Sequence, residues 1–256
     1  MFTSVKIVTP LYKTPLPPRE EQAVRHNAEI LGEYPLCFVV PQGMPHDYLL
    51  QLAPHATIIE VSDEWLGVKN GISGYNRMMT SRAFYDLFSD SEYILVCQSD
   101  AWIFRDELQA WCDKDYDYIG APWIRPPKYD TLKSKIYLLA QRLLHPTRRI
   151  HRTDILGKVG NGGLSLRKIA SFADACDKYA DIIEKFGRKK DAFYNEDVFW
   201  AMIPQEFRYP SQEEALKFAI DENPDVALRM NGNQLPMGCH GCTKDIYYSF
   251  WEPYLL

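Results

Sequence analysis

Four polar clusters stand where the hydrophobic pattern of the sequence breaks off, and they contain residue types that can do chemistry. They are Gln98-Ser99-Asp100, Asn161-Gly162-Gly163, Asn195-Glu196-Asp197 and His240-Gly241. Carboxylates can hold a divalent cation or take a proton from a reacting hydroxyl. A glycine pair lets another group approach the backbone closely. We therefore begin with these four clusters as the candidate site.

The first and third clusters each have a functional and a structural interpretation. Asp100 comes directly after the apolar run 93–97, a predicted strand, and ligands of open α/β sheets bind beyond the carboxyl ends of strands. An Asp in this position can also cap the turn that follows. In the same way, Glu196 and Asp197 are either working acids or residues that stabilise the first turn of a helix. The pattern alone leaves both possibilities open.

The six cysteines point to a reducing environment. Most are isolated within apolar patterns, as is typical of buried, reduced thiols in a cytoplasmic protein. Cys239 and Cys242 form the one close pair, which is compatible with a zinc or redox centre. A structural zinc site needs four ligands, however, and the sequence has no second close cluster. We keep this as a third interpretation, to be tested by metal analysis.

The elements that must position these clusters follow from the hydrophobic spacing. Short β-branched runs predict strands, and apolar residues at helical spacing predict helices. The expected strands are 5–10, 36–41, 57–61, 93–97 and 116–120, with a further short strand after the glycines. The expected helices are 19–31, 74–88, 105–112, 132–144 and 170–186. This order predicts an α/β fold with a mostly parallel central sheet flanked by helices.

Composition sets the outer limits. With 256 residues and 46% hydrophobic residues, the chain can bury a full core, and no linker or repeat divides it, so we expect a single domain over 1–256. A net charge of −5 argues against a nucleic-acid partner. The apolar stretch 5–11 lacks a basic leader and is interpreted as the first strand, and no window is apolar enough to span a bilayer. We expect a soluble or peripheral protein.

The segment 125–152 differs from the rest of the chain. It holds eight Lys or Arg residues and one acid, a local balance of +7. Its centre, 132–144, has the spacing of a basic amphipathic helix. Such a helix can pack on the fold as a solvated excursion. It can also dock the protein on an anionic partner, either the inner membrane leaflet or a phosphate-bearing lipid-linked glycan.

The order of the four clusters resembles the GT-A class of nucleotide-sugar-dependent glycosyltransferases. The stretch from Tyr93 to Phe104 and the triplet Glu196-Asp197-Val198 resemble the beta-1,3-galactosyltransferase-like families. The whole chain is similar to an uncharacterised bacterial family with Gln-x-Asp, Gly-Asn-Gly-Gly-x-Ser-Leu-Arg, Asn-Glu-Asp and His-Gly motifs. The resemblance implies a GT-A-like, Rossmann-like fold and transfer of a sugar to a hydroxyl acceptor, as in polysaccharide biosynthesis.

The resemblance also implies roles for individual residues. Asp100 and His240 would hold Mn²⁺ or Mg²⁺ at the leaving diphosphate, and Asp197 would act as general base with inversion, oriented by Glu196. The family motif supplies two carboxylates, whereas Gln98 takes the first position here, so weaker metal binding is expected. Basic side chains can replace the cation. The candidates are Arg77, Arg82, Arg167 and Lys244.

Further residues are expected to contact the donor or the acceptor. From topology and motif position these are Thr9, Pro10, Tyr12, Asp63, Arg77, Gln98, Ser99, Trp123, Asn161, Gly162 and Gly163. The expected partners are a nucleotide-sugar donor and a glycan or lipid-linked acceptor. The expected location is the cytoplasm, with peripheral contact at the inner membrane face. The rival from another class is a non-catalytic carbohydrate- or nucleotide-binding module on the same fold.

Overall fold

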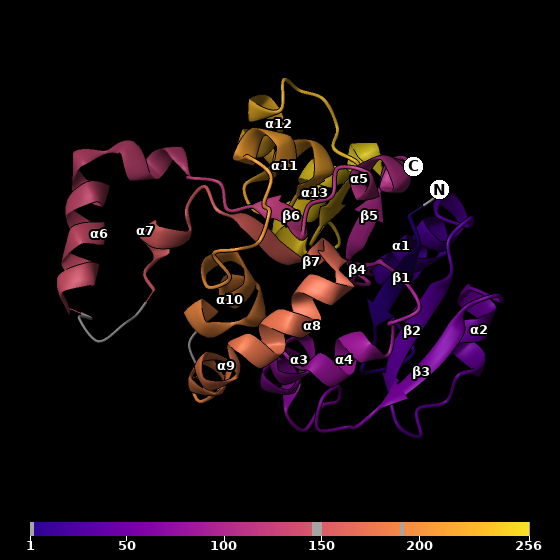
Figure 1. The fold of residues 1–256 in the computed structure, drawn as a ribbon. Coiled ribbons are helices and arrows are strands. Elements are labelled where there is room, and N and C mark those ends of the chain that lie inside the picture. The colour runs from indigo at the N-terminus through magenta and orange to yellow at the C-terminus, as the bar shows by residue number, and fades with distance from the viewer. Residues whose placement is uncertain (1–2, 145–149, 190–191, 256) are drawn as a thin grey trace.

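The computed structural model describes residues 3–144, 150–189 and 192–255. Its centre is a six-stranded sheet in the order β3-β2-β1-β4-β7-β6 (Figure 1). The strands are β1 (Val5–Pro10), β2 (Leu36–Pro41), β3 (Thr57–Val61), β4 (Tyr93–Cys97), β6 (Tyr118–Pro122) and β7 (Val159–Lys168). Strands β1 to β4 pair in parallel, and β7 is antiparallel to both of its neighbours. The predicted fold class, a mostly parallel sheet flanked by helices, is confirmed.

A second, three-stranded sheet lies beside the first. It has the order β5-β9-β8 and consists of β5 (Ala101–Ile103), β8 (Ala219–Ile220) and β9 (Gly238–His240). Three residues separate the end of β4 from the start of β5, and β9 pairs with β5 in antiparallel register, Ala101 opposite His240. The small sheet therefore brings the C-terminal part of the chain to the end of β4.

Helices cover both faces of the large sheet. On one face, apolar residues of the sheet pack against α3 (Gly71–Met79), α4 (Arg82–Asp86), α8 (Ile169–Lys178), α9 (Ala180–Gly187) and α10 (Glu196–Met202). The other face packs against α1 (Pro18–Ile30), α2 (Asp47–Leu52), α5 (Leu108–Cys112) and α11 (Gln212–Phe218). The central strands are buried on both faces, as the apolar run of β4 shows, whereas the edge strand β3 is only partly buried.

The remaining helices lie outside these two layers. Helices α12 (Pro224–Met230) and α13 (Asp245–Trp251) pack around the small sheet. Helices α6 (Leu132–Leu144) and α7 (Arg152–Ile155) belong to an excursion between β6 and β7, and α6 stands at the left edge of Figure 1, away from the sheet. Within the described part of the chain, no helix combines the length and the apolar character needed to cross a bilayer.

Two predicted helices are each divided in the structure. The segment predicted as 74–88 forms α3 and α4, because Ser81 adopts an extended conformation between them. The segment predicted as 170–186 forms α8 and α9, which meet at Tyr179. The helix predicted over 105–112 is shorter in the structure, where α5 begins only at Leu108. The short strand expected after the glycines is instead the ten-residue β7, which contains Gly160, Gly162 and Gly163. The remaining predicted helices and strands lie within about two residues of the observed ones, the usual uncertainty of element ends.

Candidate functional site

The end of β4 carries the first cluster. The backbone N–H of Gln98 donates to Gly163 of β7, and the backbone N–H of Cys242 donates to the carbonyl of Asp100. Gln98 Nε2 donates to the hydroxyl of Tyr75 at 2.9 Å. These bonds tie the segment after β4 to β7, α3 and the C-terminal chain, so the positions of Gln98 and Asp100 are set by elements distant in sequence.

His240 lies at the centre of a buried polar group. Its Nε2 lies 3.0 Å from Asp100 Oδ1 and 3.1 Å from Gln98 Oε1, and its Nδ1 lies 2.9 Å from Asp221 Oδ2. Lys244 Nζ lies 3.2 Å from the other Asp100 oxygen. The sequence analysis placed Asp100 and His240 in one site, and the structure brings them into direct contact.

Two carboxylates dominate the electrostatics here. Burial alone would lower the pKa of His240, but Asp221 and Asp100 outweigh burial and raise this pKa to about 10. Burial alone would raise the pKa of Asp100, but His240 and Lys244 outweigh it and hold this pKa well below its usual range. In this arrangement an ionised Asp100 faces a charged imidazole and an ammonium group.

Asp221 was missed by the sequence analysis. It is buried and directly follows β8, a strand of only two residues that is parallel to β9. The available signal was the same one that identified Asp100, an acid beyond the carboxyl end of a strand. Because the strand is so short, the hydrophobic pattern does not reveal it.

The two glycines of the second cluster make room for side chains of the protein. A β-carbon on Gly163 would lie 2.1 Å from His240 Nε2, and one on Gly162 would lie 2.7 Å from Glu196 Oε1 and 3.3 Å from Asp197 Cβ. Consecutive Cα atoms are about 3.8 Å apart. The histidine cluster and the acid pair therefore approach β7 at adjacent residues, where the register of β6 against β7 shifts.

Glu196 is part of a buried ion pair. Both carboxylate oxygens lie 3.1 Å from Arg167 guanidinium nitrogens, and the two side chains are 4% and 0% exposed. Arg167 also donates to Tyr85 and Ser165. The side chain of Arg167 is therefore fully used inside the protein, which removes it from the candidate phosphate-binding cations. Glu196 in turn fixes the first turn of α10 against β7.

Asp197, next to this pair, has an altered acidity. Burial, followed by the neighbouring Glu196 carboxylate, raises the pKa of Asp197 to about 7. Its Oδ1 accepts a hydrogen bond from the backbone of Val198 at 2.8 Å, and Asp221 adds to the upward shift. Asn195 directly precedes α10, but its side chain accepts a hydrogen bond from Asn76 rather than capping the helix. A carboxyl group with a pKa near neutrality suits a general base.

A cleft of about 450 Å³ opens beside Asp100. It is lined by Pro10, the last residue of β1, and by Gln98, the residue after the neighbouring strand β4. From β1 the chain adds β2 and β3 on one side of the sheet and β4 on the other. Open α/β sheets bind ligands at such a switch point between strands. The lining residues are Pro10, Tyr12, Glu20, Leu66, Gly67, Val68, Gly71, Ile72, Tyr75, Gln98, Ser99 and Asp100.

Several of these lining residues were not predicted. Val68 and Ile72 are large apolar side chains exposed to solvent, as is the predicted Tyr12. Glu20, in the first turn of α1, accepts a hydrogen bond from Ser99. The segment 66–72 has no periodic pattern, and its glycines were the one available signal.

The other residues predicted to contact the donor or acceptor differ in how exposed they are. Thr9 is buried within β1, and Asp63 is exposed in the turn after β3. Trp123 is only 4% exposed and packs in the core, so it offers no free ring face for stacking on a sugar. Arg77 donates to the backbone of Glu64 and, with Asn76 and Glu196, lines a second cleft of about 520 Å³.

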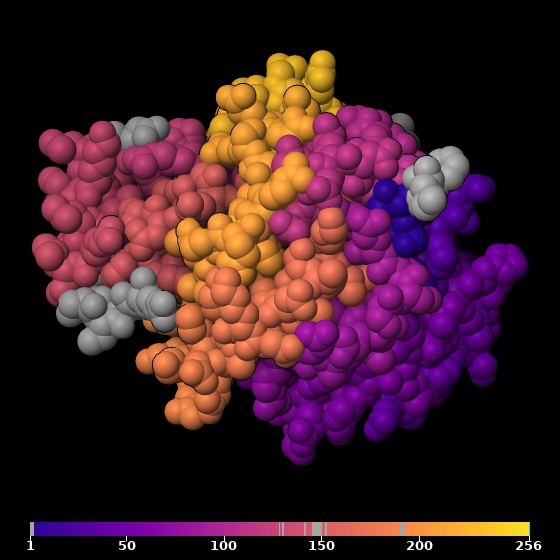
Figure 2. All heavy atoms as spheres, viewed as in Figure 1, coloured from indigo at the N-terminus to yellow at the C-terminus, as the bar shows by residue number. Residues whose placement is uncertain are grey.

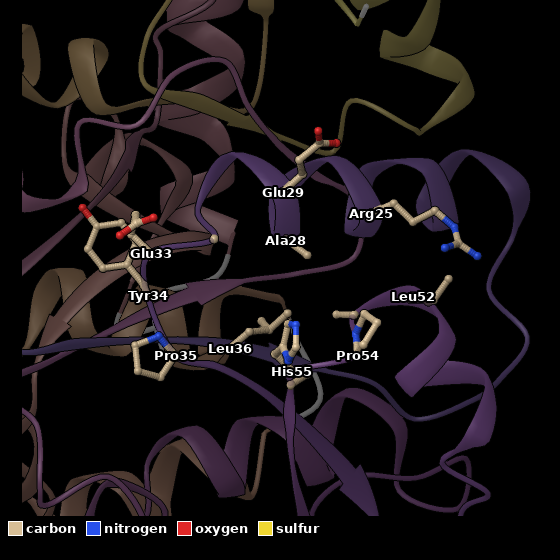
Figure 3. A pocket seen from close by; sticks show the side chains of 13 residues that line it. Arg25, Ala28, Glu29, Glu33, Tyr34, Pro35, Leu36, Leu52, Pro54 and His55 are labelled. Carbon is tan, nitrogen blue, oxygen red and sulfur yellow. The ribbon is translucent and has the colours of Figure 1, made fainter.

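A larger cavity, about 630 Å³, lies elsewhere (Figure 3). It is lined by the last turns of α1 and by the chain around Leu36 and His55, near the starts of β2 and β3. Its Arg25 is paired with Glu21. None of the four polar clusters reaches it, so it does not belong to the candidate site.

The residues at His240 fit a divalent cation only when the imidazole has lost the proton that its raised pKa holds, because a metal-binding histidine is neutral. Asp100, His240 and Gln98 offer a carboxylate, a ring nitrogen and an amide oxygen within about one ligand shell. Asp221 holds the opposite ring nitrogen, as carboxylates behind metal-binding histidines do. Among the described residues no group of three or more His, Cys, Asp or Glu side chains could hold a metal ion.

Cys239 and Cys242, the close pair considered as a zinc or redox centre, are buried free thiols.

Solved structures with this fold are glycosyltransferases. The galactosyltransferase LgtC, solved with donor and acceptor sugar analogues, is 13% identical, with a TM-score of 0.58 over 93% of this chain and 87% of that one. The bifunctional glycosyltransferase WbbM is 11% identical, with a TM-score of 0.56 over 99% of this chain and 50% of that one. GlyE of Streptococcus pneumoniae TIGR4 is 12% identical, with a TM-score of 0.54 over 99% and 60%. This chain thus spans half of WbbM and three fifths of GlyE.

The fold is that of the GT-A glycosyltransferases. At sequence level, the model of the family described as a protein of unknown function, DUF5672, matches residues 55–240, and the chain belongs to this family. No curated protein matches the chain.

Proposed function

We propose that this protein transfers a sugar from a nucleotide-sugar donor to a hydroxyl acceptor. The observation that carries the proposal is that two groups approach adjacent residues of β7, His240 with Asp100 at Gly163 and Asp197 at Gly162, and that Asp221 acts on the pKa of both His240 and Asp197. Transfer from a nucleoside diphosphate needs positive charge at the leaving diphosphate and a base at the attacking hydroxyl. This site offers both in a fold shared with glycosyltransferases.

The nucleotide is assigned to the cleft beside Asp100. Exposed Tyr12, Val68 and Ile72 give it an apolar wall, which suits a base or ribose ring. The cleft ends at Ser99 and Asp100, so a nucleotide there directs its diphosphate toward His240 and Lys244. Asp63, in the turn after β3, is assigned to the rim of this site.

Mn²⁺ or Mg²⁺ is the proposed cofactor, held by Asp100, His240 and Gln98. When bound, such a cation neutralises the charge that develops on the diphosphate. Lys244 places a further positive group beside Asp100, and this group can neutralise the diphosphate where the missing carboxylate weakens the cation site. Asp221 keeps the imidazole of His240 turned toward Asp100.

Asp197 is the proposed general base. It accepts the proton of the acceptor hydroxyl, whose oxygen forms the new bond to the sugar carbon while the carbon–oxygen bond to the diphosphate breaks. A single displacement of this kind inverts the configuration at that carbon. Glu196 positions Asp197 through its pair with Arg167, and Asn161 with Gly162 borders the reacting centre. The acceptor is a glycan or a lipid-linked glycan.

A panel of nucleotide sugars tests the proposal on the full chain. We expect one donor to raise the melting temperature in the presence of Mn²⁺ or Mg²⁺, since a ligand at 100 times its dissociation constant adds about 2.7 kcal/mol. The same donor should be slowly hydrolysed, releasing the nucleoside diphosphate. Stabilisation without any release or transfer would identify a binding module instead. No response to any donor would refute the proposed function.

A further inference from the structure

Helix α6 turns an apolar stripe toward solvent. Leu132, Ile136, Leu139 and Leu143 follow one another at intervals of four and three residues, so they share one helical face. They are 74%, 59%, 60% and 71% exposed. The packed-helix interpretation of this segment is therefore wrong for the stripe, because its leucines and isoleucine are not covered by the fold.

The helix is held away from the body by a defined base. The chain leaves β6 through Trp123 and returns to β7 through Gly157 and Lys158, and Trp123 exchanges two backbone hydrogen bonds with these residues, at 3.0 and 2.8 Å. Arg142 lies 3.4 Å from Asp154 of α7. Figures 1 and 2 show α6 and α7 as a lobe that projects from one side of the molecule.

The charged side chains of α6 itself have one sign. Lys133, Lys135 and Arg142 are exposed on α6, and Lys135 and Arg142 flank the stripe on the same side. The sequence from 131 to 152 contains no Asp or Glu, although the whole chain carries −5. The predicted contributions of Arg148 and Arg149 lie outside the described residues.

We propose that α6 is a membrane-interface helix that inserts its apolar stripe into an anionic lipid surface. Thirteen residues make a helix about 20 Å long, which is suited to lying in the plane of a bilayer and too short to cross it. The flanking bases complement acidic headgroups. A symmetric pair of copies would instead bring identical basic flanks together, and like charges oppose such a pair.

Vesicle flotation tests this directly. We expect the full chain to bind vesicles with about one quarter phosphatidylserine in phosphatidylcholine and not pure phosphatidylcholine, with binding reduced at high salt, where the Debye length falls to about 3 Å at 1 M. The triple variant Ile136→Ser, Leu139→Ser and Leu143→Ser should lower bound protein by about tenfold or more. Lys133→Gln with Lys135→Gln should lower binding most at low salt.

Matched controls use exposed residues far from α6 in sequence. Ile246→Ser removes an exposed apolar side chain, and Lys178→Gln with Lys217→Gln removes two exposed charges. All should bind vesicles as the parent does. Absence of binding by the parent at low salt, or equal binding by the stripe variant, overturns the proposal. If the parent forms a dimer but does not bind vesicles, and the stripe variant is a monomer, the stripe is instead a contact with a second copy of the chain. These outcomes do not depend on glycosyl transfer.

Discussion

The backbone at Gly163 lies against the imidazole of His240, so that a β-carbon at position 163 would stand 2.1 Å from Nε2. The ring cannot swing aside freely because Asp221 holds its other nitrogen at 2.9 Å. Gly163→Ala should therefore displace His240 from Asp100 and remove donor-induced stabilisation. Gly187→Ala, in an open position on α9, is the matched control and should change nothing at the site. A thermal-shift titration of both variants checks this.

Asp100→Asn should abolish transfer and remove the enhancement of nucleotide binding by Mn²⁺ or Mg²⁺. The reason is that Asp100 is the one carboxylate at the end of β4, and Asn lacks its charge. Asp245→Asn changes an almost fully exposed acid near Lys244 and is the control. Nucleotide affinity measured by calorimetry with and without the cation decides the matter. Metal-dependent binding that persists in folded Asp100→Asn would contradict the ligand assignment.

Asp197→Asn should lower turnover by about 100-fold or more while donor affinity stays unchanged, the range for losing a positioned base. In the parent, kcat/KM should rise with pH and level off above about 7, because the base acts only when ionised and burial raises the pKa of Asp197 to about 7. A pH–rate profile of parent and variant measures this. If Glu196→Gln lost the activity and Asp197→Asn kept it, the two roles would be reversed.

The same pKa predicts how stability depends on pH. The folded protein holds the Asp197 proton more tightly than the unfolded chain, whose Asp pKa is near 3.9. The contribution of this group is thus fully present below about pH 4 and is lost as the pH rises toward about 7. Asp197→Asn should therefore gain stability relative to the parent above pH 7, as followed by urea unfolding at several pH values. If the difference in unfolding free energy between variant and parent stayed constant from about pH 4 to about pH 7, the shifted pKa would be contradicted.

Glu196→Gln should destabilise the fold by about 3 kcal/mol or more, because it leaves the buried Arg167 guanidinium without its partner charge. Glu206→Gln breaks an exposed pair with Lys178 and should cost about 1 kcal/mol or less. Chemical denaturation of the two variants compares these costs. Equal losses would mean that the Arg167 pair is no more important to the fold than a surface pair.

The first four strands of the large sheet were predictable because each is a short run rich in β-branched and other apolar residues that ends at proline or polar residues. The division of α3 from α4 was not, since the helical spacing of apolar residues continues across Ser81 although its backbone is extended. Periodicity records which side chains face the core, and it does not record a change of backbone direction between two helices that pack on the same face.

The candidate site was predicted in part. Asp100 was found because it follows the five-residue apolar strand β4, whereas Asp221 follows a strand of two residues that left no pattern. Arg167 was considered as a phosphate-binding residue, but its position inside β7 buries it against Glu196. For α6, the spacing predicted an amphipathic helix correctly. Whether its apolar stripe was covered depended on tertiary packing, which spacing alone cannot reveal.

The excursion between β6 and β7 also affects how the chain tolerates changes in length. Ile124 is buried at its start, Ile150 is buried just before α7, and the backbone bonds of Trp123 close its base. Antiparallel neighbours such as β6 and β7 need only a turn of about two to five residues between them. The entropy of closing a loop rises slowly with its length. We therefore expect family members to differ here by insertion or deletion. The excursion can then change in length or sequence while the sheet and its polar clusters keep their register.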